Sequence, residues 1–262
     1  MLPAALALSG ALLAPGADGG PLPEGNAYVR ALVERHRQRE HAVDSYAYDL
    51  TETREEVDEK GRVHKRDSRR YEVFHVEGRP VRTLVEENGK ALAGARAARE
   101  ASEARRQAAA ISAGEVAVER PALRLSRLLE ESEFTTTGRE EVAGRPALVL
   151  EFAPRAGTPG TADRGLRVAG RVWIDEEEGQ VVRAEFHNTQ GLRVKGGLAA
   201  SLTTLDVSLE FRKVDDQVWL PLLRKATVEG RRFLFQTFRV RTTARYGPFR
   251  RFTVDAQEQG GK

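Results

Sequence analysis

Residues 205–211, Leu-Asp-Val-Ser-Leu-Glu-Phe, alternate apolar and polar side chains at every position. Successive side chains of a β-strand point to opposite faces of a sheet, so this period of two predicts a half-buried strand. The side chains expected on its buried face are Leu205, Val207, Leu209 and Phe211. Such a strand requires neighbouring strands and a layer that covers its apolar face.

Further strands with similar patterns are predicted on both sides of this stretch, joined by short turns rich in Gly, Asn and Asp. They cover residues 45–54, 70–76, 81–86, 135–142, 148–152, 168–175, 180–188, 218–221, 223–229 and 233–243. A turn is predicted at Gly230, and residues 246–254 are expected to add an edge strand. Because tight turns join antiparallel neighbours, the sequence predicts an antiparallel sheet, and this many strands are expected to curl.

Two regions have the composition and spacing of helices. Asn26 is a suitable N-cap for a helix reaching about residue 43, in which apolar side chains recur every three or four positions. Residues 91–113 are rich in Ala, Arg and Glu, and a second helical pattern follows Pro121. The predicted fold class is therefore α+β: a strongly curved antiparallel sheet with helices packed against one face and a helical insertion at about residues 91–132.

The N-terminal residues have features of a secretory signal. Residues 2–14 form an uncharged apolar run, shorter than the roughly 20 residues that a membrane-spanning helix needs. Small residues follow, so cleavage is expected near Gly16 or Gly19, although no Lys or Arg precedes the run. Residues 1–19 are thus predicted to be a signal peptide and residues 20–262 a single exported domain. A disordered Ala-rich tail is the alternative interpretation.

The composition excludes several classes of protein. The chain has no Cys, which rules out disulfides, thiolate metal sites, a Cys nucleophile and N-terminal lipidation. Its 42 Lys and Arg nearly balance 39 Asp and Glu, and Arg alternates with Glu at residues 69–72 and 139–141. Nucleic-acid-binding proteins usually gather their positive charge into a patch, so nucleic acid is not an expected partner.

Motifs for catalysis or metal binding are missing from the sequence. None of the histidines has the spacing of metal ligands, no Ser lies in a G-x-S-x-G motif, and no Gly-rich loop has the form that binds phosphates. The acidic runs at residues 175–178 and 215–216 coincide with predicted turns and do not match a calcium-binding loop. We therefore expect no catalytic residue, no metal and no cofactor.

Several stretches resemble periplasmic proteins related to the outer-membrane lipoprotein-sorting carriers, the LolA/LolB-like group. They are residues 46–52, 70–74, 144–152 and 218–221, together with G-x-x-W-I-D followed by G-x-V-x-R, which is the most specific motif. Here its residues are Gly170, Trp173, Ile174, Asp175, Gly179, Val181 and Arg183. The resemblance implies a LolA-like open β-barrel of about eleven strands that is wrapped over helices and holds an apolar cavity.

Side chains on the predicted strands are candidates for lining such a cavity, although each aromatic one is, by itself, more readily explained as part of the core. The ligand-cavity candidates are Tyr48, Tyr71, Leu150, Phe152, Trp173, Leu209, Phe211 and Phe235. In a cavity of this kind, acyl chains would gain about 0.8 kcal/mol for each CH₂ group removed from water.

These observations favour a non-enzymatic periplasmic carrier or sensor that binds a lipophilic ligand, namely a lipid or the acyl chains of a lipoprotein. The expected partners are such a ligand or an acylated protein, with peripheral contact to a membrane. Two alternatives stay open. One is a protein–protein interaction module of the cell envelope that works through its helices or a sheet edge; the other is a hydrolase whose site is assembled from distant residues.

Overall fold

The structure is a computed structural model that describes residues 20–40, 44–115, 130–157, 166–194, 200–215, 218–232 and 236–251. The predicted signal peptide and the second predicted helix of the insertion lie outside these residues. The elements are α1 (Gly25–Glu40), β1 (Tyr46–Val57), β2 (Val63–Val76), β3 (Arg79–Glu87), β4 (Lys90–Ala91), α2 (Gly94–Ser112), β5 (Ser132–Val142), β6 (Arg145–Pro154), β7 (Val168–Asp175), β8 (Val181–Asn188), β9 (Leu192–Val194), β10 (Ala200–Val214), β11 (Val218–Arg232) and β12 (Gln236–Arg251).

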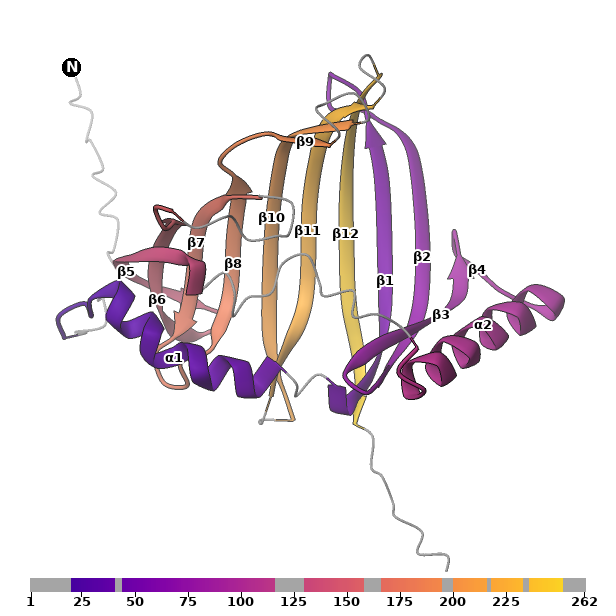
Figure 1. Cartoon of the computed structure of the whole chain (residues 1–262), viewed down its shortest axis with the longest axis horizontal. Helices are drawn as coiled ribbons and strands as arrows, with labels where there is room; N and C mark the ends of the chain where they lie inside the picture. Colours follow the sequence, from indigo (N-terminus) through magenta and orange to yellow (C-terminus); the bar gives the residue numbers. More distant parts are fainter. Residues whose placement is uncertain are drawn as a thin grey trace, which may run out of the picture.

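All of these strands belong to one antiparallel sheet (Figure 1). Its strand order is β4-β3-β2-β1-β12-β11-β10-β8-β7-β6-β5, and the short β9 pairs with β10 beside this path. The sheet is strongly curved, with β4 and β5 at its two ends, so it does not close into a barrel. The predicted open antiparallel sheet is therefore confirmed, including its approximate number of strands.

Two details of the C-terminal region differ from the prediction. Gly230 does not form a turn but lies buried inside β11, where a Cβ atom would come 2.1 Å from the carbonyl oxygen of Ser201. A glycine at that position marks a close approach of two strands instead of a turn. Residues 246–251 continue β12, which is not an edge strand because it pairs with both β1 and β11.

The start of α1 protects the outer edge of β5. The carboxylate of Glu24 accepts hydrogen bonds from the backbone N–H groups of Asn26 and Ala27, which lower its pKa and cap the helix. Asn26, the predicted N-cap, instead accepts a hydrogen bond of 2.8 Å from the backbone N–H of Phe134 in β5. An otherwise exposed strand edge is thereby covered by the chain itself.

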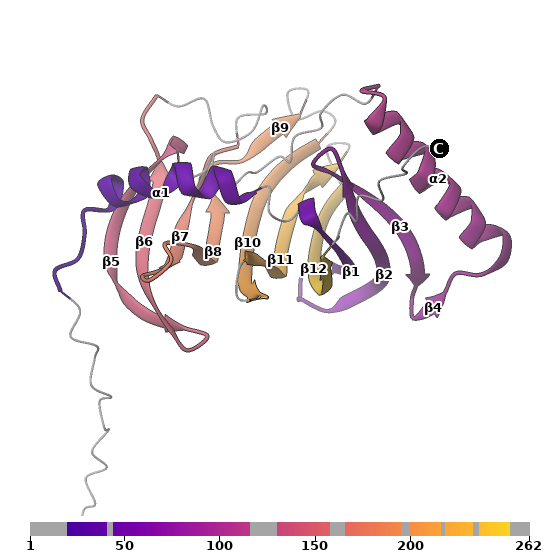
Figure 2. The ribbon, with the colours of Figure 1, turned by 90° about the horizontal axis from the view of Figure 1, so that it is seen from below.

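The two helices lie on opposite faces of the sheet, not on one face. Val29 and Leu32 of α1 pack on the face around which the sheet curves, here called the inner face (Figure 2). In α2, Ala104 and Ile111 pack against Val81 of β3. Val81 pairs with Phe74, so the two side chains point to the same face. The residue before Phe74 is Val73, which points to the inner face with Leu50. Because neighbouring side chains of a strand alternate, Phe74 and Val81 point outward and α2 covers the outer face.

Candidate functional site

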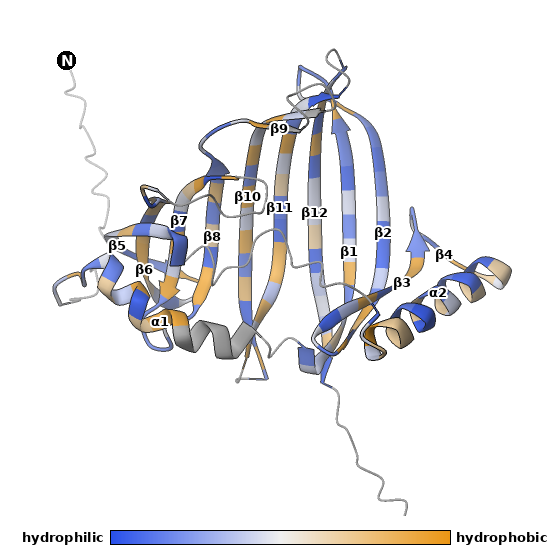
Figure 3. Ribbon diagram, in the orientation of Figure 1, coloured by the Kyte–Doolittle hydropathy of each residue, from blue (hydrophilic) through white to orange (hydrophobic). Residues whose placement is uncertain are grey.

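The inner face carries a floor of apolar side chains on its central strands. Leu205 of β10 lies opposite Val228 of β11, which lies opposite Val240 of β12. Below this row, Val207 lies opposite Ala226. We call the half-buried members of this surface the apolar floor: Leu205, Val207, Leu209, Phe211, Ala226 and Val228. Figure 3 shows hydrophobic positions along β10 and β11, in contrast to the largely hydrophilic β2.

Two members of the apolar floor differ from the rest in their packing. Val207, Leu209 and Phe211 pack against the buried core beneath α1. Leu205 and Val228, by contrast, pack against none of the core clusters found among the described residues, and both are partly exposed. Apolar side chains in this position are available to contact a ligand.

A charged row borders the apolar floor. Leu209 lies opposite Arg224, Arg224 lies opposite Ala244, and Ala244 lies opposite Glu52. The carboxylate of Glu52 lies 3.2 Å from the guanidinium of Arg224 and 3.8 Å from that of Arg82. The inner face therefore presents two arginine side chains and one carboxylate beside its apolar surface.

Beyond this row lies a second cluster, which is aromatic. Tyr48 packs with Leu50 and Val73, and its ring centroid lies 5.8 Å from that of Tyr246 and 5.4 Å from that of Phe249. Burial raises the pKa of Tyr48 to about 12, so its hydroxyl stays protonated. The inner face thus holds two apolar regions separated by charged side chains.

The structure divides the predicted ligand-cavity candidates among several places. Leu150 and Phe152 are buried beneath α1, in the cluster that Leu209 and Phe211 border. Tyr48 and Tyr71 belong to the aromatic cluster. Leu150 and Phe152 therefore lie on the same face and next to Leu209 and Phe211 of the apolar floor. The two tyrosines lie across the charged row. Phe235 lies outside the described residues.

Trp173 cannot line the same surface, because it points to the outer face. The central carbons of the Arg171 and Arg183 guanidinium groups lie 5.2 and 4.7 Å from the centroid of its ring. Its indole N–H donates a hydrogen bond of 2.7 Å to Glu140. Its neighbours Val172 and Ile174 point inward, so the alternation of side chains along β7 directs Trp173 outward.

The outer face has a groove with a volume of about 870 Å³ across β5–β8, β10 and β11. It runs between two rows of paired side chains, and its floor is the backbone between them. One row is Glu151, Arg171, Glu185, Ser208 and Lys225; the other is Ala169, His187, Asp206 and Thr227. Because its walls are mostly polar, this groove suits a polar ligand better than an acyl chain.

Residues of the motif at 170–183 have structural roles in the sheet and in the β7–β8 turn. A Cβ atom on Gly170 would lie 1.9 Å from the carbonyl oxygen of Glu185, so only glycine fits. Asp175 is completely buried at the β7–β8 turn, and its carboxylate accepts a hydrogen bond of 2.7 Å from the backbone N–H of Glu178. Gly179 has the positive φ that this turn requires.

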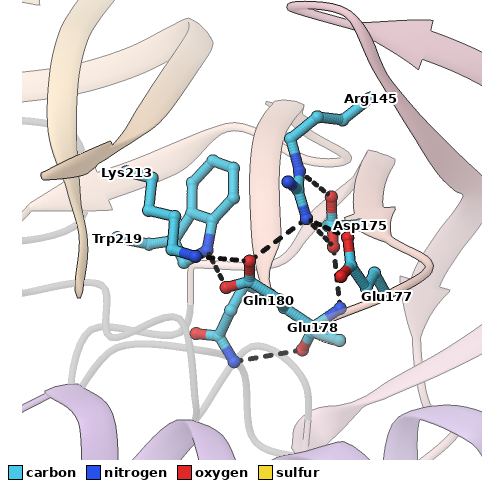
Figure 4. Close-up of polar contacts among 8 residues, drawn as sticks. Arg145, Asp175, Glu177, Glu178, Gln180, Lys213 and Trp219 are labelled. Carbon is cyan, nitrogen blue, oxygen red and sulfur yellow. Dashed lines mark hydrogen bonds and ion pairs between the residues drawn. The ribbon is translucent and has the colours of Figure 1, made fainter. Parts of the chain in front are cut away.

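A polar network extends from this turn to two neighbouring hairpins (Figure 4). Arg145 donates hydrogen bonds to Asp175, Glu177 and Glu178. Glu178 also accepts hydrogen bonds of 2.8 Å from Lys213 and from the indole N–H of Trp219. The network therefore joins the β5–β6, β7–β8 and β10–β11 turns.

The ionisation of this network indicates a structural role. Burial alone would raise the pKa of Asp175, but hydrogen bonds from Arg145 and from the backbone of Glu178 outweigh it and lower that pKa. The hydrogen bond from Lys213 lowers the pKa of Glu178, and Asp175 raises that of Arg145. A carboxylate that stays ionised at neutral pH is poorly matched to general acid–base chemistry.

Among the described residues, no group of His, Asp and Glu has the arrangement needed to hold a metal ion. No helix in the same part of the chain has the length and apolar character needed to cross a membrane. Of the apolar floor, Leu209 and Phe211 are among the candidates predicted from the sequence, whereas Leu205 and Val228 are not. The alternation of residues 205–211 already placed Leu205 on the same face, so this signal was present.

Comparison with known proteins gives one family. The family model described as the MucB/RseB N-terminal domain matches residues 51–222. No curated protein matches the chain.

Several solved structures match over most of their length. A putative outer membrane lipoprotein-sorting protein domain from Vibrio parahaemolyticus is 15% identical, with 89% of this chain and 95% of that one covered and a TM-score of 0.37. A LolA superfamily protein from Nitrosomonas europaea is 11% identical, with 86% and 94% covered and a TM-score of 0.39. MucB is 15% identical, with 83% and 94% covered and a TM-score of 0.27.

Proposed function

Since this chain belongs to the MucB/RseB N-terminal domain family, as the match over residues 51–222 shows, we propose that it is a non-enzymatic carrier or sensor of the periplasm. Its ligand is lipophilic, a lipid or the acyl chains of a lipoprotein, and binds on the inner face. The predicted resemblance to the lipoprotein-sorting group is confirmed at the level of the family. Export by a cleaved signal at residues 1–19, without lipidation, is part of this proposal.

The observation that carries the proposal is the partial exposure of Leu205 and Val228. These side chains lie opposite each other on the central strands, and neither contributes to a described core cluster. An acyl chain lying over them would remove apolar surface from water on both sides of the contact. Arg224 borders the floor and shares Glu52 with Arg82, so both guanidinium groups would stay near the polar end of such a ligand.

Native mass spectrometry of the protein purified from the cell envelope tests this proposal. The expected result is a protein ion with a releasable lipid mass. In the variant Leu205→Gln, which makes the apolar floor polar, the lipid-bound fraction should fall several-fold. Leu223→Gln is the matched control, because Leu223 is half-buried on the same pair of strands but points to the outer face. Protein free of lipid in every preparation would refute the proposal.

A second candidate function is binding of a protein segment in the outer groove. The polar walls of this groove favour it, since Glu151, Arg171 and Lys225 lie in one wall and Asp206 lies in the other, with few apolar side chains among the lining residues. One related structure is titled as MucB in complex with MucA(peri), which concerns that protein. Capture of one specific envelope protein, abolished by Asp206→Arg but unchanged by Leu205→Gln, would support this function.

A further inference from the structure

One end of the sheet gathers the strand tips of β1, β2, β11 and β12. Glu55 of β1 lies opposite Arg241 of β12, and Arg231 of β11 lies opposite Thr237 near the start of β12. The tips of these four strands lie at the top of the molecule in Figure 1. We call residues 54–67, 229–232 and 236–241 the strand-tip end.

The strand-tip end holds the surplus positive charge of the chain. It has nine Lys and Arg side chains against six Asp and Glu, a difference of three, and the formal net charge of the whole chain is also +3. The remaining residues are therefore balanced in charge. The excess of positive charge is concentrated at this end because the tips of four strands, which are far apart in the sequence, meet there.

Ion pairs neutralise five of the six acidic side chains at this end. Three of these pairs are short: Arg62 with Asp58 at 2.7 Å, Arg66 with Glu55 at 2.8 Å and Arg239 with Glu229 at 2.7 Å. Arg54 pairs with Glu56, and Lys65 with Asp67. Among the described residues, four cations are left without a carboxylate partner. We call these the tip cations: Lys60, Arg231, Arg232 and Arg241.

The surroundings of the tip cations favour contact with a surface. All four are exposed. The guanidinium of Arg232 lies 4.9 Å from the ring centroid of Phe238, which limits its freedom. Val63, at the same end, is 42% exposed and is one of two exposed large hydrophobic side chains among the described residues. Cations that share one end of a sheet with an exposed apolar side chain suit the headgroup region of an anionic bilayer.

We propose that the tip cations dock this protein on a bilayer that contains anionic phospholipid. A second groove, of about 540 Å³, opens at this end and includes Val240, which lies opposite Val228 of the apolar floor. Docking would therefore bring the membrane close to the proposed ligand site. The inference rests on the proposed function for its purpose, but its evidence is the distribution of charge.

Flotation with lipid vesicles tests the docking surface in the full mature chain. Wild-type protein should bind vesicles that contain phosphatidylglycerol, bind those of phosphatidylcholine alone weakly, and dissociate as salt is raised. The test variant replaces the tip cations: Lys60→Gln, Arg231→Gln, Arg232→Gln and Arg241→Gln. The control variant removes the same charge elsewhere from exposed positions: Lys90→Gln, Arg99→Gln, Arg105→Gln and Arg245→Gln.

The test variant should bind anionic vesicles at least about tenfold more weakly than wild type, while the control stays within about twofold of wild type. Equal loss in both variants would overturn the proposal, as would equal binding to neutral vesicles. Capture of an acidic envelope protein without any vesicle binding would likewise overturn it. Co-purified lipid, measured on the same variants, separates the two proposals: vesicle binding without bound lipid would contradict only the proposed function.

Discussion

The guanidinium of Arg145 donates hydrogen bonds of 2.6 and 3.1 Å to the carboxylate of Asp175, whose side chain is completely buried. The two residues come from adjacent turns, 30 positions apart in the sequence. A bidentate pair of this kind fixes geometry as well as charge. It joins the β5–β6 turn to the β7–β8 turn at one end of the sheet.

Replacing Arg145 by Met is expected to destabilise the protein by about 3 kcal/mol, because it leaves the buried carboxylate of Asp175 without its partner. Urea unfolding followed by circular dichroism measures this difference. The matched control is Arg99→Met, an exposed position on α2. It should change stability by no more than about 0.5 kcal/mol. Similar losses in both variants would contradict the role of the pair.

His75 is expected to make stability depend on pH. Burial lowers the pKa of its ring, and the attraction of Asp44 opposes this only in part. The unfolded chain, with an ordinary pKa of about 6.5, then binds more protons than the folded chain at mildly acidic pH. Stability should therefore fall as pH drops below about 6.5.

Unfolding free energies of wild type and His75→Gln, measured from neutral to mildly acidic pH, check this prediction. The variant should show a flatter dependence than wild type. His187→Gln, which alters an exposed histidine on the outer face, should keep the wild-type slope. Identical slopes in wild type and His75→Gln would show that another group is responsible.

Gly170→Ala is expected to destabilise the sheet by about 2–3 kcal/mol, because the new methyl group would meet the backbone of Glu185 and Phe186 in the neighbouring strand. Thermal unfolding is the measurement. Gly138→Ala is the control, since a Cβ atom there has no neighbour within 4 Å. If both variants lose the same stability, the close approach of β7 and β8 is not what requires glycine.

Much of the fold could be predicted because alternation is a local signal. The pattern of residues 205–211 predicted a strand and its two faces. The same alternation puts Trp173 and Val172 on different faces of β7, so Trp173 could have been left out of the cavity candidates. Long-range pairing has no such signal. The position of β12 between β1 and β11 depends on contacts between the two ends of the chain, so residues 246–251 could be mistaken for an edge.

The candidate site was only partly predictable for the same reason. Leu209 and Phe211 could be placed on an inner face from their spacing, and that face exists. The separation of Tyr48 from them by Glu52 and Arg224 depends on the register of four strands.

The acidic run at residues 175–178 was correctly assigned to a turn. Its partner Arg145 could not be found, because no sequence pattern joins the two turns.

Photo-crosslinking with an acyl chain that carries a diazirine, followed by peptide mass spectrometry, tests directly whether the inner face binds a lipophilic ligand. Adducts are expected on the apolar floor, at or beside Leu205 and Val228, and they should be lost when an excess of unlabelled lipid competes. Adducts found only on the outer face, for example at Leu223 or Thr227, or no competable adduct at all, would contradict the claim that the inner face binds a lipophilic ligand.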